Sequence, residues 1–381
     1  MRSAIKAVAA GGAAVALLFA MAGPAAAEPP PNPGPLDYTS VGSDTLQGIE
    51  DAIQADWNAT SPAHKYVSWD ATGPTPIVPK GTGTSACASI TRPNGSGGGI
   101  NALAANAVTG SGDSGNHYCI NIARSSRGPV STDPTGLTWL NLAKDDVSWA
   151  ADATGNAPSN LTRAQLIGIY TCAVGFRHWN DSGIGGSSAD EIYPVLPQPQ
   201  SGTRSFWLSA LGITTPGSCV DVTTNPEENE GVNAIFTGAH KNNVVFPYSG
   251  AVFAAQHYNG HGTGQEGTLT IRDIDGQSPV TASGSPRTIN PNFTTPVPAA
   301  DKNKFLRIVY KVIRTTALNT TNTKDGSVYA DLAAPYNLTT HTGGYECQYS
   351  TASPFPTPQQ ELLSYGFASL GAQCGAVAAQ T

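Results

Sequence analysis

Short apolar runs that suit β-strands alternate along this chain with longer segments whose apolar residues recur at helical spacing. The first such unit joins a strand-like run at 38–41 to a helical stripe formed by Leu46, Ile49, Ile53 and Trp57. The same pattern predicts further strands at 119–123, 192–196 and 244–248, helices that begin near residues 44, 96, 124, 162, 201 and 249, and a last helix over 358–370. Repeated strand–turn–helix units predict an α/β fold that binds its ligand at the carboxyl ends of the strands.

Other stretches carry weaker patterns. The run 305–313 fits a strand or a short amphipathic helix, and 260–298, rich in Gly, Thr, Ser and Pro, predicts loop and irregular strand. Two pairs have the form of a capping box, Asp44 with Gln47 and Thr162 with Gln165, and therefore indicate helix starts.

The beginning of the chain has the features of an export signal. Arg2 and Lys6 precede an apolar run at 7–23, and the small residues at 25–27 suit a signal peptidase. We therefore expect a signal peptide at 1–27 and a stiff Pro-rich leader at 28–35, with a retained membrane anchor as the alternative. No later segment approaches the ~18 apolar residues that span a membrane. The predicted location is extracellular or in the cell envelope.

Composition narrows the class of protein. The 381 residues include 42 Gly and 29 Pro, with 39% hydrophobic and 12% charged residues. This length exceeds what one core usually sustains, so two lobes are expected. The net charge of −7 argues against nucleic acid as a partner, but a buried pocket for a small anion depends on local dipoles rather than on the total charge.

Six cysteines lie in the part expected to be exported, and an even count outside the cytoplasm favours disulfides. Their 15 possible connectivities remain open from sequence. We prefer nearest neighbours, because each bond would then close a loop within one segment: Cys87–Cys119, Cys172–Cys219 and Cys347–Cys374. A structural metal is the weaker alternative, since no CxxC pair exists and His257 and His261 straddle a glycine.

Four short segments place Gly, Ser, Thr or Arg at predicted helix starts: 42–45, 96–99, 124–127 and 201–204. The first turn of a helix offers unpaired backbone N–H groups and partial positive charge, so it can hold an anion. A dehydrated oxyanion needs many donors, which amides, hydroxyls and arginines together supply. These segments predict a single oxyanion pocket, and simple helix caps are the competing interpretation.

These segments also carry a resemblance to a known family. The segments 42–46, 94–103, 122–129, 161–166 and 201–204 occur in the order seen in phosphate-binding periplasmic proteins of ABC transporters. The resemblance covers roughly residues 40–260 and implies a type II periplasmic-binding-protein fold: two α/β lobes, a hinge of crossing strands and an anion enclosed between the lobes. With the repeated units it suggests lobe I at 36–129 and 246–381, and lobe II at 130–245.

The resemblance also implies ligand contacts, from Thr45 and Leu46 through backbone N–H groups and from Ser126, Ser201, Gly202 and Thr203. Two positions depart from the family: Arg127 replaces an aspartate, and Pro197 replaces an arginine. Arg124, Arg127 and Arg204 are candidates to supply the positive charge, and Asp44 to accept the proton of monohydrogen phosphate. The full predicted set adds Ser43, which lies in the first helix-start turn.

The expected function is the extracellular capture of inorganic phosphate, or a similar oxyanion such as sulfate, for delivery to a membrane ABC permease. We expect a monomer without cofactor, metal or catalysis. One alternative is a trypsin-like serine peptidase, because Gly112–Gly115 resembles the nucleophile motif; its spacing from His64 is too short for that fold. Another is an adhesion or carbohydrate-binding module, although Trp57, Trp179 and Trp207 fit core packing better.

Overall fold

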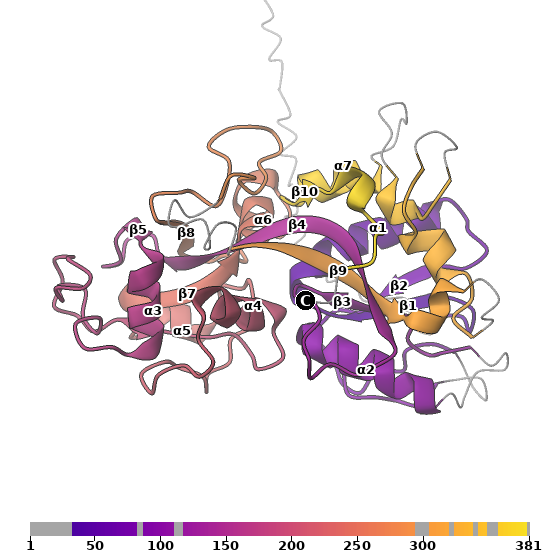
Figure 1. Cartoon of the computed structure of the whole chain (residues 1–381), viewed down its shortest axis with the longest axis horizontal. Coiled ribbons are helices and arrows are strands. Elements are labelled where there is room, and N and C mark those ends of the chain that lie inside the picture. Colours follow the sequence, from indigo (N-terminus) through magenta and orange to yellow (C-terminus); the bar gives the residue numbers. More distant parts are fainter. Residues whose placement is uncertain are drawn as a thin grey trace, which may run out of the picture.

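Two long strands, β4 (Leu137–Asp152) and β9 (Leu306–Arg314), run antiparallel and cross between two lobes (Figure 1). They belong to a mixed ten-stranded sheet whose central order is β2-β1-β3-β9-β4-β7-β6. The structure is a computed structural model that describes residues 33–81, 87–109, 117–293, 305–319, 324–337, 342–348 and 357–378. The predicted signal peptide at 1–27, most of the leader and the Gly112–Gly115 motif lie outside these residues.

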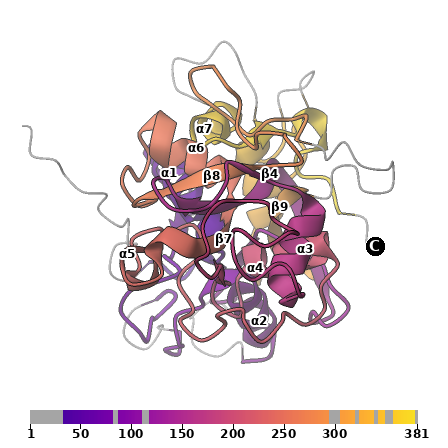
Figure 2. The ribbon, with the colours of Figure 1, turned by 90° about the vertical axis from the view of Figure 1, so that its left-hand side faces the viewer.

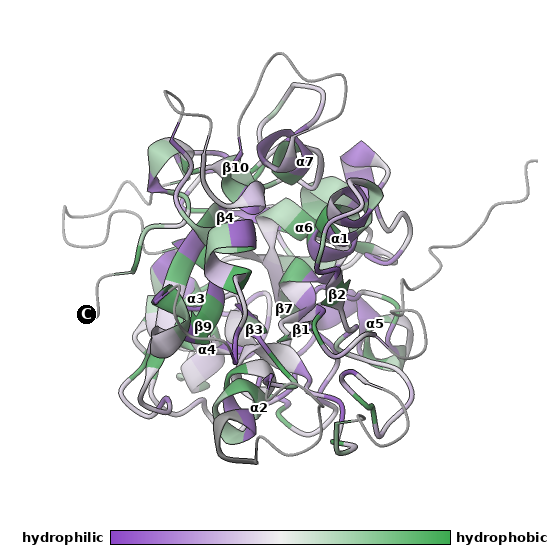
Figure 3. Cartoon of the chain, turned by 90° about the vertical axis from the view of Figure 1, so that its right-hand side faces the viewer, coloured by the Kyte–Doolittle hydropathy of each residue, from purple (hydrophilic) through white to green (hydrophobic). Residues whose placement is uncertain are grey.

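One lobe is built on three parallel strands, β1 (Tyr38–Gly42), β2 (Tyr66–Ser68) and β3 (Ile122–Ser125), and β3 pairs with β9. Helices α1 (Gln47–Ala59) and α2 (Gly95–Thr109) belong to this lobe, and α7 (Pro358–Ser364) lies close to α1. Figure 3 shows apolar stretches of β4 and β9 entering the interior of this lobe. The apolar stripe predicted for α1 is buried there, apart from the half-buried Trp57.

The other lobe forms around the second half of β4, which pairs with β7 (Val244–Ser249) and β8 (Leu269–Ile274). Its remaining elements are β5 (Asn160–Leu161), α3 (Arg163–Thr171), β6 (Tyr193–Pro194), α4 (Gly202–Leu211), α5 (Ala234–Thr237) and α6 (Gly250–Ala254). Seen end-on, α3 and α5 lie on opposite sides of the strands (Figure 2). Trp149, Trp179 and Trp207 are fully buried in its core.

The predicted strands at 38–41 and 244–248 are confirmed as β1 and β7. The run at 119–123 is strand only from Ile122 onward, in β3, and the run at 192–196 only at Tyr193–Pro194, in β6. The ambiguous run at 305–313 forms the strand β9. The capping box of Thr162 and Gln165 is confirmed. The one proposed for Asp44 is wrong, because the Gln47 side chain instead accepts the Ala71 N–H at 2.8 Å.

Three other predictions of elements need correction. No helix begins at 124–127, because β3 continues to Ser125 and an extended loop follows it to β4. The segment 260–298 contains the regular strand β8. The last helix ends at Ser364 rather than at residue 370, since Gly366 follows with a left-handed φ of +81°, and a Cβ atom at this position would lie 2.2 Å from the Ala251 carbonyl oxygen.

The predicted lobe boundaries at 129/130 and 245/246 stay a prediction. Since β7 and β8 both pair with the second half of β4, we propose that lobe II continues past residue 245 as far as Phe293, whose side chain lies in the same core. Three disulfides join Cys87–Cys119, Cys172–Cys219 and Cys347–Cys374, which is the nearest-neighbour pairing.

A buried charged cluster ties the first lobe to β9. The Lys311 ammonium forms ion pairs with Glu50 on α1 and with Glu346 at 2.8 Å, and donates to the Tyr66 hydroxyl oxygen at 2.7 Å. Lys311 and both carboxylates have at most 1% of their side chains exposed. One ammonium therefore compensates two buried carboxyl groups.

In the part of the chain that the structure describes, no helix is long and apolar enough to cross a membrane. Nor do the described His, Cys, Asp and Glu residues include a group arranged to hold a metal ion. His257 instead contacts Glu266 and stacks on Phe253, and His261 stacks on Tyr365.

Candidate oxyanion site

The loop after β1 meets the N-terminus of α4 where the two lobes touch. Ser43 and Thr45 follow β1 at the start of a 3₁₀ helix (Asp44–Leu46), and Ser201 is the N-cap of α4. The hydroxyl oxygens of Thr45 and Thr203 lie 3.3 Å apart, although 158 residues separate them in sequence. Two segments that the sequence predicted to share one pocket therefore face each other across the lobe boundary.

Their donors converge on a carboxylate that belongs to the chain itself. Glu228 Oε1 accepts from Ser43 Oγ at 3.1 Å, Thr45 N at 3.4 Å and Thr45 Oγ1 at 3.2 Å. Glu228 Oε2 accepts from Ser201 Oγ and from Thr203 N at 3.0 Å. We call these four donor residues, Ser43, Thr45, Ser201 and Thr203, the oxyanion cradle. Each is at most 3% exposed and Glu228 is completely buried, so the charge is held by protein donors.

Ser201 shows that capping and anion binding are compatible at one residue. Its Oγ accepts the Arg204 N–H at 3.0 Å, as an N-cap does, while its hydroxyl hydrogen is donated to Glu228. The two interpretations of the helix-start hydroxyls therefore do not exclude each other, because a hydroxyl both donates and accepts.

The three predicted arginines lie elsewhere. Arg124 is buried and donates to the Ser43 carbonyl at 3.1 Å, to Ser68 Oγ at 2.8 Å and to the Trp69 carbonyl at 2.7 Å, so it braces the loop after β1. Arg127 pairs with Asp133 at 2.7 Å, and Arg204 donates to the Pro197 carbonyl at 2.9 Å. Among the described hydrogen bonds, none of the three reaches Glu228. Leu46 places its side chain in the core behind the cradle.

The cation that does reach the cradle is Arg307, on the crossing strand β9. Its Nη1 donates to Thr203 Oγ1 at 3.1 Å, and its Nε and Nη2 contact Asp145 Oδ2 at 2.8 and 2.7 Å. Sequence reasoning missed this residue because it lies 104 positions after Thr203 and belongs to no helix-start motif. The only feature of the sequence that could have indicated its role is that it is a basic residue within the apolar run at 305–313.

Ser126 and Gly202 bring the lobes into contact beside the cradle. Ser126 N donates to Ser96 Oγ at 3.0 Å, and the two hydroxyl oxygens are 3.3 Å apart. A Cβ atom on Gly202 would lie 2.2 Å from Ser96 Oγ and 2.3 Å from Ser126 Oγ. The absence of a side chain at Gly202 thus lets the first turn of α4 dock against the opposite lobe.

We therefore expect Gly202→Ala to weaken the docking of the lobes. The added methyl group must displace buried hydroxyls, and such overpacking costs about 1–3 kcal/mol. Denaturant unfolding should show the loss of stability, and small-angle scattering should show a larger radius of gyration. Ser209→Ala, at an exposed position of the same helix, is the control. An unchanged radius and stability in Gly202→Ala would contradict this account of the contact.

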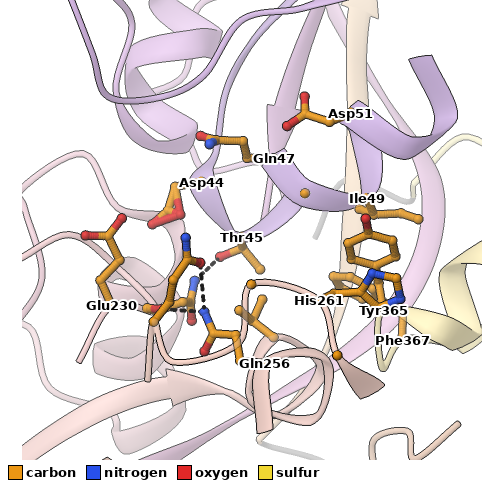
Figure 4. A pocket seen from close by; sticks show the side chains of 16 residues that line it. Asp44, Thr45, Gln47, Ile49, Asp51, Glu230, Gln256, His261, Tyr365 and Phe367 are labelled. Carbon is orange, nitrogen blue, oxygen red and sulfur yellow. Dashed lines mark hydrogen bonds between the residues drawn. The ribbon is translucent and has the colours of Figure 1, made fainter. Parts of the chain in front are cut away.

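An acidic cavity of about 430 Å³ adjoins the cradle. Asp44, Thr45 and Glu230 line one side, and His261 stacks on Tyr365 at the other (Figure 4). Burial raises the pKa of Asp44 well above its ordinary value, and Glu228, Glu230 and Glu227 raise it further. Burial also raises the pKa of Glu227 to about 7. The protonated form of Asp44 is thus favoured, which can donate a hydrogen bond but cannot accept the proton of phosphate.

Comparison with known proteins identifies the family. The model of the PBP superfamily domain matches residues 76–327, and the chain belongs to this superfamily. The lobes and crossing strands agree with a two-lobed periplasmic-binding-protein fold. No curated protein matches the chain significantly.

Solved structures show a distant likeness. A phosphate transport receptor from Vibrio cholerae is 17% identical, with a TM-score of 0.43 over 76% of this chain and 91% of the receptor. A putative phosphate ABC transporter substrate-binding protein from Clostridium perfringens is 15% identical, with a TM-score of 0.47 over 76% and 90% of the two chains. For a phosphate-binding protein from Stenotrophomonas maltophilia the identity is 12% and the TM-score 0.48, over 88% and 91%.

Proposed function

We propose that this protein is an extracellular solute-binding protein that captures inorganic phosphate, or a similar tetrahedral oxyanion, and delivers it to a membrane ABC permease. The observation that carries the proposal is the oxyanion cradle, in which donors from both lobes converge on one carboxylate. The resemblance of the helix-start segments to phosphate-binding proteins supports phosphate as the anion. A predicted signal peptide at 1–27 supports the extracellular location.

The donor set suits an oxyanion for physical reasons. A carboxylate presents two acceptor oxygens with several lone pairs, and phosphate presents the same kind of acceptor with more oxygens. The cradle combines backbone N–H groups at two helix starts with three hydroxyls, while Arg307 supplies positive charge behind Thr203. Because the donors belong to two lobes, a bound anion would hold the lobes together, as in hinge closure around a ligand.

Asp44 bears on the choice of anion. Its ionised form would accept a proton only from monohydrogen phosphate, whereas its protonated form donates to phosphate and sulfate alike. Since the pKa of Asp44 is raised, the second case is favoured. We therefore propose that phosphate and sulfate bind with affinities within about tenfold of each other. This difference is smaller than the effect of losing one charge-assisted hydrogen bond.

Titration calorimetry of the mature protein with phosphate and sulfate tests the proposal. Ser201→Ala removes one hydroxyl donor from the cradle, and we expect phosphate affinity to fall about 10–100-fold, the value of a hydrogen bond to a charged group. Ser209→Ala on the exposed face of α4 should bind like the wild type. Absence of binding by the wild-type protein at millimolar phosphate and sulfate would overturn the proposed function.

A further inference from the structure

Glu228 fills the oxyanion cradle, which is where the proposed function puts the ligand. Its carboxylate accepts five hydrogen bonds from the oxyanion cradle and links the loop after β1 in one lobe to α4 in the other. We infer that Glu228 is a tethered competitor of the free oxyanion, which fills the cradle and holds the lobes together when no ligand is bound. This inference rests on the proposed function, because it assigns the residue that limits the affinity of the same site.

The residue after Glu228 fixes the position of its carboxylate. Asn229 has a left-handed φ of +64°, a conformation that asparagine adopts more readily than most residues. Its side chain donates to Thr45 Oγ1 at 2.9 Å and accepts the Ser249 N–H at 2.9 Å. Its carbonyl accepts from the Tyr248 hydroxyl and from Gln256 Nε2 at 3.0 Å. The turn is therefore anchored on β7 and α6 and directs Glu228 into the cradle.

The residue before Glu228 also contacts the opposite lobe. Glu227 Oε1 accepts from Asn94 Nδ2 at 2.8 Å, and Asn94 Oδ1 accepts from Gln198 Nε2 at 2.9 Å. Three consecutive residues therefore form hydrogen bonds with helix starts of the first lobe. Glu227 pairs with Asn94, Glu228 with Ser43, and Asn229 with Thr45. This three-residue segment bridges the lobes as a bound anion would.

Tethering makes this carboxylate an effective competitor. A group attached by a short linker acts at an effective concentration in the millimolar range or above, so free phosphate must displace it before binding. The apparent affinity falls in proportion to the fraction of molecules whose cradle is empty. If Glu228 occupies the cradle in about 90–99% of molecules, its removal raises the apparent affinity about 10–100-fold.

The test compares Glu228→Ala and Glu228→Gln with Glu230→Ala. Glu230 lies two residues along the same segment and lines the adjoining cavity, and no hydrogen bond between it and the cradle is present among the described residues. Its removal therefore takes a carboxyl group from the same segment without emptying the cradle. Glu228→Gln keeps the size of the side chain and serves if Glu228→Ala does not fold.

Phosphate calorimetry and small-angle scattering give independent measurements. We expect Glu228→Ala to bind phosphate at least about tenfold more tightly than the wild type, and Glu230→Ala to change affinity by less than about threefold. Without phosphate, Glu228→Ala should have a larger radius of gyration than the wild type, and phosphate should reduce it.

The outcomes separate this inference from the proposed function. If the wild type binds phosphate and the folded Glu228 variants bind equally or more weakly, the inference is wrong and the proposed function stands. If only the Glu228 variants bind, the inference stands and phosphate capture by the wild-type protein is overturned. If neither binds while the variants remain folded, the cradle is not an oxyanion site and both proposals fail. A gain in Glu230→Ala equal to that in Glu228→Ala would also contradict the inference, because charge alone would explain it.

Discussion

Replacing Lys311 by methionine should destabilise the protein by about 3–5 kcal/mol, because it leaves buried carboxyl groups without their cation. Lys311 lies between Glu50 and Glu346, and all three side chains are at most 1% exposed. Methionine fills similar space, so the loss would reflect charge rather than a cavity. Denaturant unfolding monitored by circular dichroism measures the effect, and a loss below about 1 kcal/mol would contradict it.

Glu346→Gln is the matched control for this cluster. Burial, with Glu50 adding to it, raises the pKa of Glu346 from 4.5 to about 8 despite the opposing effect of Lys311. A raised pKa means that the folded state favours the protonated form. This contribution to stability is present below pH 4.5 and is lost as pH rises through about 8. Glu346→Gln should therefore show a smaller decline in unfolding free energy over this range, whereas Lys311→Met should be destabilised throughout neutral pH.

Arg307→Met should affect both stability and ligand binding. Arg307 neutralises Asp145 on β4, and these two side chains are 2% and 0% exposed. The neighbouring Asp146 has its pKa raised by burial and by Asp145, and Arg307 opposes that shift. Without the guanidinium, a buried acidic pair remains in the crossing strands, at a cost of about 3–5 kcal/mol. Unfolding in denaturant measures this loss.

The same substitution removes the donor to Thr203 Oγ1. We expect phosphate affinity to fall by at least about tenfold, since the cradle loses its adjacent positive charge. Arg307→Lys keeps the charge but not the forked geometry, so it should recover part of the stability and less of the affinity. Arg204→Ala is a further control, because Arg204 contacts the Pro197 carbonyl rather than Glu228. A larger affinity loss in Arg204→Ala than in Arg307→Met would restore the sequence-based assignment.

Local sequence determined much of the architecture. Apolar spacing defined β1 and α1, and the capping pair Thr162–Gln165 defined the start of α3, because these features depend on neighbours within a few residues. The helix-start segments at 42–45 and 201–204 also identified the four residues of the cradle. The hydroxyl and amide donors of these segments can be read from the sequence without knowledge of their position in the fold.

The crossing strand β4 escaped prediction for a physical reason. It spans 16 residues and is buried along nearly its whole length, so it shows no alternation of apolar and polar positions. It also contains Asp145 and Asp146, whose burial depends on Arg307 and on the contacts of α6. Nothing within the strand's own sequence reveals that partner.

Tertiary structure alone decided which charges meet at the site. Arg124, Arg127 and Arg204 belong to the helix-start segments predicted from sequence, yet their guanidinium groups contact backbone carbonyls and Asp133 instead of Glu228. Arg307 and Glu228 arrive from distant segments, on β9 and on the turn before α5. Sequence proximity specifies which donors a turn can offer, whereas the packing of two lobes determines which cation and which anion reach them.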